Sequence, residues 1–94
     1  MKVKNNLFYE FAKFIKSNGN IRIIFGIPND VYIYKNFRLS VVNGGYNQWI
    51  TKCDDEQNPI WMASLIVKDK SEVNYTNISE QEFNTEFQQL SNCV

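Results

Sequence analysis

The alternation of apolar and polar residues divides the chain into a helix, a run of strands and a second helix. Residues 6–18 repeat apolar side chains at helical spacing and carry polar ones on the opposite face. Asn5 or Asn6 stands where an N-cap is expected, and Gly19 where a left-handed residue often ends a helix. The predicted helix buries one face, which consists of Leu7, Phe8, Phe11, Ala12, Phe14 and Ile15.

Period-two alternation follows this helix and predicts extended strands. Residues 20–27 place an isoleucine or a phenylalanine at every second position. Residues 31–42 are extended as well, with Val31, Ile33 and Phe37 on one apolar face, but Lys35 falls on that same face. These residues therefore form either one bulged strand or two separate strands.

Two further strands follow a hairpin signal. Residues 43–45 read Asn-Gly-Gly, which accepts the positive φ angles of a tight turn, so residues 46–53 are expected to return as a strand. Residues 60–67 are apolar on both faces apart from Ser64, which predicts a central strand covered on both sides. A short edge strand over residues 73–75 completes a sheet of four to five strands.

A second helix is predicted from residue 79 onward. Ser79 and Glu82 have the spacing of a capping box, and Phe83, Phe87 and Leu90 form one apolar seam. The predicted fold class is α+β, with an N-terminal helix, an antiparallel sheet of four to five strands and a C-terminal helix, in the order α-β-β-β-β-(β)-α. Ninety-four residues correspond to a single domain over residues 1–94.

The composition argues against most catalytic and membrane functions. The chain has no histidine, the commonest general base, and neither Cys53 nor Cys93 belongs to a zinc-binding pair. The longest apolar run, residues 60–67, is far shorter than the roughly 20 residues that span a bilayer. We therefore expect a cytoplasmic protein that is not an enzyme and has no cofactor, no metal site and no membrane segment.

Zero net charge conceals an uneven distribution of charge. Residues 1–52 hold eight basic and two acidic side chains, whereas residues 53–94 hold eight acidic and two basic ones. The first hypothesis is a protein-binding module that presents an acidic face to a basic partner surface, such as one that binds nucleic acid. The predicted partner-binding residues are Asp54, Asp55, Glu56, Glu80, Glu82, Glu86, Trp49 and Tyr46.

Such a module would be a small inhibitor or regulator that masks its partner's surface. Thirteen Asn and ten Ile against two Ala are typical of an AT-rich genome, as in low-GC bacteria and their phages. In size and outline the chain is like the small proteins that phages and mobile elements use to inhibit host proteins, anti-defence proteins included. This analogy concerns the fold alone.

Two alternatives stay open. A nucleic-acid-binding domain would use Arg22, Lys35 and Arg38 for phosphate contacts and would stack bases on the sheet aromatics Tyr32, Tyr34, Tyr46 and Trp49. Zero net charge argues against it, because phosphate binding needs concentrated positive charge. The other alternative is a homodimeric structural subunit that associates through a sheet edge or the Phe-rich helix.

Overall fold

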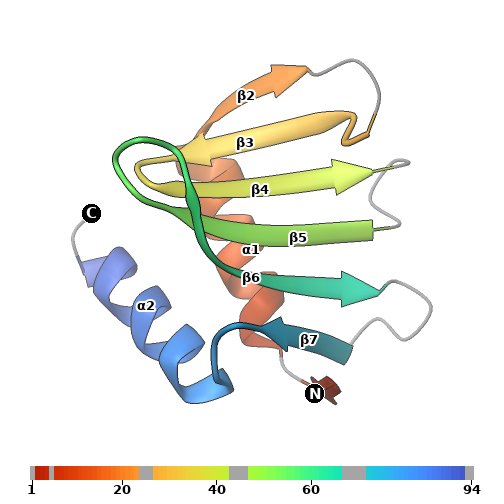
Figure 1. Cartoon of the computed structure of the whole chain (residues 1–94), viewed down its shortest axis with the longest axis vertical. Helices are drawn as coiled ribbons and strands as arrows, with labels where there is room; N and C mark the ends of the chain where they lie inside the picture. The colour runs from red at the N-terminus through yellow and green to blue at the C-terminus, as the bar shows by residue number, and fades with distance from the viewer. Residues whose placement is uncertain (1, 5, 24–26, 43–46, 67–71, 93–94) are drawn as a thin grey trace.

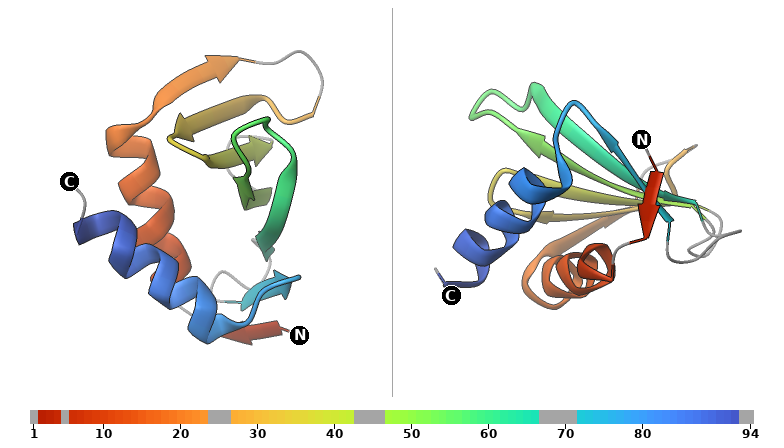
Figure 2. Two further views of the ribbon diagram at one scale, coloured as in Figure 1. Left: turned by 60° about the vertical axis from the view of Figure 1, so that its left-hand side comes forward. Right: turned by 90° about the horizontal axis from the view of Figure 1, so that it is seen from below.

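The computed structural model describes residues 2–4, 6–23, 27–42, 47–66 and 72–92, and these form one antiparallel sheet with two helices on one face (Figures 1 and 2). The strand order is β1-β7-β6-β5-β4-β3-β2. Each strand from β2 to β7 therefore pairs with its neighbours in sequence. The elements are β1 (Lys2–Lys4), α1 (Leu7–Asn18), β2 (Asn20–Ile23), β3 (Asp30–Tyr34), β4 (Phe37–Val42), β5 (Asn47–Cys53), β6 (Pro59–Ile66), β7 (Glu72–Thr76) and α2 (Glu80–Asn92).

The predicted α+β architecture is confirmed, with a larger sheet. Six strands lie between the helices and β1 adds a seventh at the edge beside β7, where four to five were predicted. Part of the difference arises because residues 31–42 do not form one bulged strand. They contribute to two strands joined by the turn at Lys35 and Asn36, where Lys35 adopts a φ of 52°.

This turn also changes which side chains share a face. Tyr34 and Phe37 are register partners, so both point toward the helices. Val31 and Ile33 consequently point to the opposite face from Phe37, although the sequence pattern placed all three together. The prediction that these three side chains share one face was wrong, because Lys35 and Asn36 form a turn and do not continue the alternation of a strand.

The core lies between the sheet and the two helices, and Phe83 of α2 is at its centre. This side chain is fully buried. Its ring centroid lies 5.0 Å from that of Phe11, 5.4 Å from Tyr75, 5.6 Å from Trp61 and 6.1 Å from Phe8. One aromatic cluster therefore joins α1, α2, β6 and β7.

The helix ends of α1 and α2 differ in how they compare with the predicted caps. At the start of α1, Asn5 lies outside the described residues, and Asn6 has a helical backbone and makes no side-chain cap. At its end, Gly19 is extended, with a φ of −96° instead of the predicted left-handed value. In α2 the capping box is present, because the Ser79 Oγ accepts a hydrogen bond from the Glu82 N–H at 3.1 Å and donates one to Glu82 Oε1 at 3.0 Å.

Gly19 is required by packing rather than by its φ angle. A Cβ atom there would lie 2.7 Å from the Ile15 carbonyl oxygen and 2.8 Å from that of Ile33. Both distances are too short for a real contact, and both neighbours are backbone atoms that cannot move aside easily. The absent side chain lets the chain pass directly from α1 into β2 beside β3.

No helix among the described residues covers the second face of the sheet, which we call the open face (Figure 2). The prediction that residues 60–67 are covered on both sides is therefore wrong for the first half of β6. Ile60 and Met62 are 53% and 37% exposed there, whereas Trp61, Ala63 and Leu65 on the helix side are buried.

Replacing Phe83 with alanine should destabilise the protein by about 3–5 kcal/mol, because it leaves a cavity among four aromatic rings. Phe87→Ala is the matched control, since this ring is only partly buried and contacts Phe11 and Phe14. We expect it to cost about 1–2 kcal/mol. Urea unfolding followed by circular dichroism measures both, and equal losses would contradict a central role for Phe83.

Gly19→Ala should destabilise the protein by about 1–3 kcal/mol, because the added methyl group collides with two backbone oxygens. Ser17→Ala, in the last turn of the same helix, is the control and should change stability by less than about 0.5 kcal/mol, since Ser17 is exposed. Thermal unfolding of the two variants tests this difference. A Gly19→Ala protein as stable as the control would show that the backbone there relaxes freely.

Candidate functional site

The open face presents two rows of side chains that cross the sheet in register. Directly opposed residues of antiparallel strands point to the same face, so each row is contiguous. The first row consists of Arg22, Val31, Ser40, Trp49, Ser64 and Asn74. The second row consists of Asn20, Ile33, Arg38, Thr51, Met62 and Thr76.

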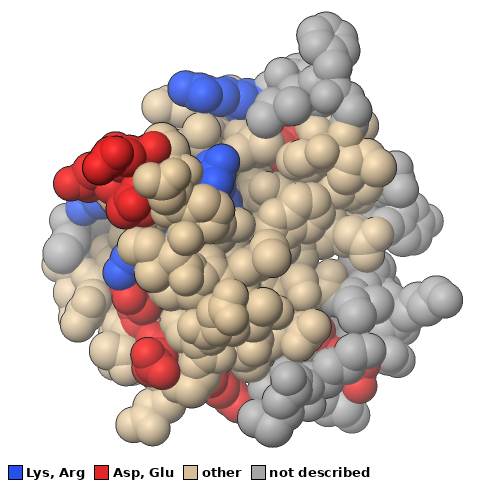
Figure 3. Space-filling view, in the orientation of Figure 1, with Lys and Arg blue, Asp and Glu red and all other residues tan. Residues whose placement is uncertain are grey.

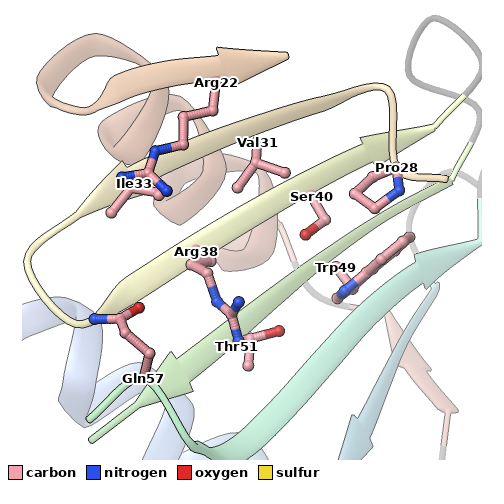
Figure 4. Close-up of a pocket in the computed structure, with 9 residues that line it drawn as sticks. All are labelled: Arg22, Pro28, Val31, Ile33, Arg38, Ser40, Trp49, Thr51 and Gln57. Atoms are coloured by element: carbon pink, nitrogen blue, oxygen red, sulfur yellow. The ribbon is translucent and has the colours of Figure 1, made fainter. Parts of the chain in front are cut away.

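The β2 to β5 part of these rows borders a pocket of about 420 Å³, which we call the open-face pocket. This volume is in the range of small-ligand sites, roughly 300–1,000 Å³. Two residues outside the rows complete it: Pro28 from the β2–β3 connection and Gln57 from the β5–β6 loop (Figure 4). The lining residues are Arg22, Pro28, Val31, Ile33, Arg38, Ser40, Trp49, Thr51 and Gln57.

Two arginines give the open-face pocket its charge. Among the described residues, the lining contains no carboxylate and neither Arg22 nor Arg38 forms a salt bridge. Arg22 is exposed on the edge strand β2, whereas the Nε atom of Arg38 is buried and has no hydrogen-bond partner within the described part of the chain. A buried donor without an acceptor costs about 1–3 kcal/mol, so this atom favours an incoming anion.

The pocket has an apolar end and a polar end. Figure 4 shows Trp49 and Pro28 at one end and Gln57 at the other, with the Arg38 side chain directed toward Thr51, its register partner on β5. Trp49 is half-buried, while Trp61 is only 5% exposed and belongs to the core. Of the two tryptophans, Trp49 is thus the one available to a ligand on this face.

The sheet aromatics of the nucleic-acid hypothesis do not lie together. Tyr32 and Tyr34 pack on the helix side, where Tyr32 lies under the ammonium group of Lys16 and Tyr34 contacts the ring of Phe14 at 5.5 Å. Tyr46 lies outside the described residues. Lys35 is in the β3–β4 turn and does not line the pocket. Of the residues that the nucleic-acid hypothesis names, the open-face pocket brings together Arg22, Arg38 and Trp49.

The acidic β5–β6 loop uses two of its three carboxylates to shape itself. Asp54 Oδ1 accepts hydrogen bonds from the backbone N–H groups of Glu56 at 2.9 Å and Asn58 at 2.8 Å. The bond from Asn58 is the main reason that the pKa of Asp54 is lowered below its ordinary value. Asp55 Oδ1 accepts from the side-chain amide of Asn36 at 3.1 Å, which ties this loop to the β3–β4 turn.

The glutamates of α2 are partly committed as well. Glu82 belongs to the capping box, and Glu86 forms an ion pair of 2.7 Å with Lys52 of β5. Figure 3 shows acidic side chains gathered over the β5–β6 loop and along α2, with basic ones between them, and a few more acidic side chains elsewhere on this face. Within the described residues, Glu56 and Glu80 are the predicted acidic site residues whose carboxylates have no such partner.

The predicted partner-binding residues are therefore divided between two surfaces. Trp49 is on the open face, but Glu80, Glu82 and Glu86 are on α2, which packs against the opposite face. Ser40, Thr51 and Gln57, which line the pocket, were missed by the sequence analysis. Ser40 is two residues from Arg38 and Thr51 is two residues from Trp49, but only the strand register shows that they share a face with both arginines.

Three further features of the described residues concern metal binding, thiols and membranes. The described residues contain no group of three His, Cys, Asp or Glu residues that could hold a metal ion. Cys53 is a free thiol buried at the end of β5. Neither described helix has the length and apolar character needed to cross a bilayer.

Comparison with known proteins yields no relative on which to base a function. The chain matches no protein-family model, no curated protein and no solved structure. Its function is therefore inferred from the residues of the open face and of the acidic surface, by which we mean the carboxylates of the β5–β6 loop and of α2.

We expect the Asp54 carboxyl to titrate below the ordinary aspartate pKa of about 3.9, because its ionised form accepts two backbone N–H bonds. A lowered folded-state pKa means that these bonds stabilise the loop above the unfolded pKa. That stabilisation is lost as the pH falls through the folded value. Carbon-13 NMR of the carboxyl groups measures the midpoint, and the protection of the Glu56 and Asn58 amides from exchange, relative to their intrinsic exchange rates at each pH, should fall over the same interval. A midpoint at or above the ordinary value would contradict this role.

Proposed function

We propose that the protein is a non-enzymatic protein-binding module whose contact surface is the open face, and that it acts as a small inhibitor or regulator by masking its partner. The observation that carries the proposal is the side-chain content of this uncovered face. Trp49, Met62 and Ile60 lie there beside two arginines without carboxylate partners among the described residues. Trp, Met and Arg are the residues enriched in protein interfaces, and Trp and Arg dominate their binding energy.

The acidic surface supports the proposal less well than the open face. Asp54, Asp55, Glu82 and Glu86 already accept hydrogen bonds or an ion pair from this chain. A partner that bound them would have to compete with those bonds. The open face presents the opposite situation, because the Arg38 Nε has no acceptor within the described part of the chain.

A nucleic-acid partner is supported by a narrower observation, the meeting of Arg22, Arg38 and Trp49 in one pocket. Single-strand binding sites usually combine several stacked aromatics with a track of positive charge. Here Tyr32 and Tyr34 pack toward the helices and Lys35 lies outside the pocket, so neither feature extends along the face.

Capture of partners from a cell lysate by the immobilised protein tests the proposal. Trp49→Ala should weaken capture by about thirtyfold in affinity, the loss typical of an interface anchor. Glu80→Lys is the matched control on the acidic surface and should leave capture unchanged. Mass spectrometry identifies the retained protein, and melting curves confirm that both variants fold.

Two results would contradict the proposal. Loss of capture with Glu80→Lys but not with Trp49→Ala would place the interface on the acidic surface. Loss of capture after nuclease treatment of the lysate, together with direct binding of single-stranded oligonucleotide, would favour the nucleic-acid alternative.

A further inference from the structure

We propose that the open-face pocket is a carboxylate subsite, which binds an aspartate, glutamate or C-terminal carboxylate in an acidic segment of the partner protein. This inference rests on the proposed function and adds the chemistry that the pocket recognises. Arg38 is the principal ligand of the carboxylate, and Trp49 contacts the residue next to it.

The position of Arg38 suits this task. It lies on β4 directly opposite Thr51 of β5, and its half-buried side chain lines the pocket and is directed toward Thr51 (Figure 4). A guanidinium group presents Nε–H and Nη–H as a planar fork that fits the two oxygens of a carboxylate. The Nε–H, buried and without an acceptor among the described residues, is one arm of that fork. It can donate to a carboxylate once the side chain turns to present it, and the carboxylate then also neutralises the charge.

The remaining lining adds a second charge and an apolar wall. Arg22 contributes from β2, on the far side of β3, and its exposed side chain is free to approach a bound anion. Among the described residues neither arginine has an ion-pair partner of its own. Val31, Pro28 and Trp49 line the pocket as apolar surface, which suits an apolar residue adjacent to the acid.

Two observations favour a peptide carboxylate over the phosphates of a nucleic acid. The pocket, at about 420 Å³, holds about one or two amino-acid side chains. Its described lining contains two cations and one aromatic ring, too few to follow a polyanionic strand.

The test is an NMR titration of the nitrogen-15-labelled protein with two blocked tripeptides, acetyl-Leu-Glu-Leu-amide and its isosteric control acetyl-Leu-Gln-Leu-amide. The glutamate peptide should shift the Arg38 Nε–H and Trp49 indole signals and bind at least about tenfold more tightly, the effect of a charge-assisted hydrogen bond. Inorganic phosphate and a ten-residue oligo-dT are titrated in parallel, and both should bind more weakly than the glutamate peptide.

Two variants with the same change of charge locate the site. Arg38→Gln should remove the preference for glutamate, whereas Lys35→Gln, in the same β-hairpin but outside the pocket, should keep affinity within about twofold. Arg22→Gln is the substitute if Arg38→Gln fails to fold, because Arg22 is exposed on an edge strand. We expect this variant to weaken binding of the glutamate peptide as well.

Equal affinity for the two peptides, or no binding of either, would overturn the carboxylate subsite. Tighter, Arg38-dependent binding of phosphate or oligo-dT would overturn it in favour of a phosphate site. The proposed function is tested separately. If capture of a protein depends on Trp49 but the two peptides bind equally, protein binding through the open face is supported and the carboxylate subsite is contradicted. If capture does not depend on Trp49, binding through the open face is contradicted whatever the peptide affinities are.

Discussion

Both helices of this chain must bury their apolar faces against the same side of one sheet, and the ring of Phe83 holds them there. It contacts Phe8 and Phe11 of α1 and Trp61 and Tyr75 of the sheet, so neither helix can leave that side without opening the core. An antiparallel sheet can leave its second face to solvent. The open face, with its exposed Ile60 and Met62, follows directly from this one-sided packing.

The charged side chains of the helix side and of the open face also differ. On the helix side and in the loops, carboxylates serve the fold: Glu86 pairs with Lys52 across α2 and β5, Glu82 caps α2, and Asp54 shapes the β5–β6 loop. The open face instead holds Arg22 and Arg38, and the part of their pocket that the structure describes contains no carboxylate. These carboxylates are committed to contacts within the fold, although Glu56 and Glu80 are not, whereas Arg22 and Arg38 have no ion-pair partner among the described residues. This contrast is why we place the contact surface on the sheet and not on α2.

Local sequence patterns predicted the structure correctly where all the residues of the pattern belong to one helix. Apolar spacing predicted α1 within one residue, and the Ser79–Glu82 pair predicted the start of α2. At Lys35 the sequence indicated an irregularity but left a bulge and a break open, because alternation carries no information about a two-residue turn that restarts it in the opposite phase. Prediction failed at Gly19, where the constraint is the approach of the Ile33 carbonyl, a residue distant in sequence.

The amino-acid sequence by itself determined the two helices, the strand-rich middle and the absence of histidine chemistry, because periodicity and composition are properties of neighbouring residues. Only the tertiary structure decided which residues form the candidate site. Arg22, Arg38, Trp49 and Thr51 come from three strands, and only the register of β2 to β5 places them on one face. A shift of one residue in any of these pairings would turn a whole strand's side chains over. Register depends on the turns and on the packing of the core together, so it cannot be predicted from a pattern of neighbouring residues.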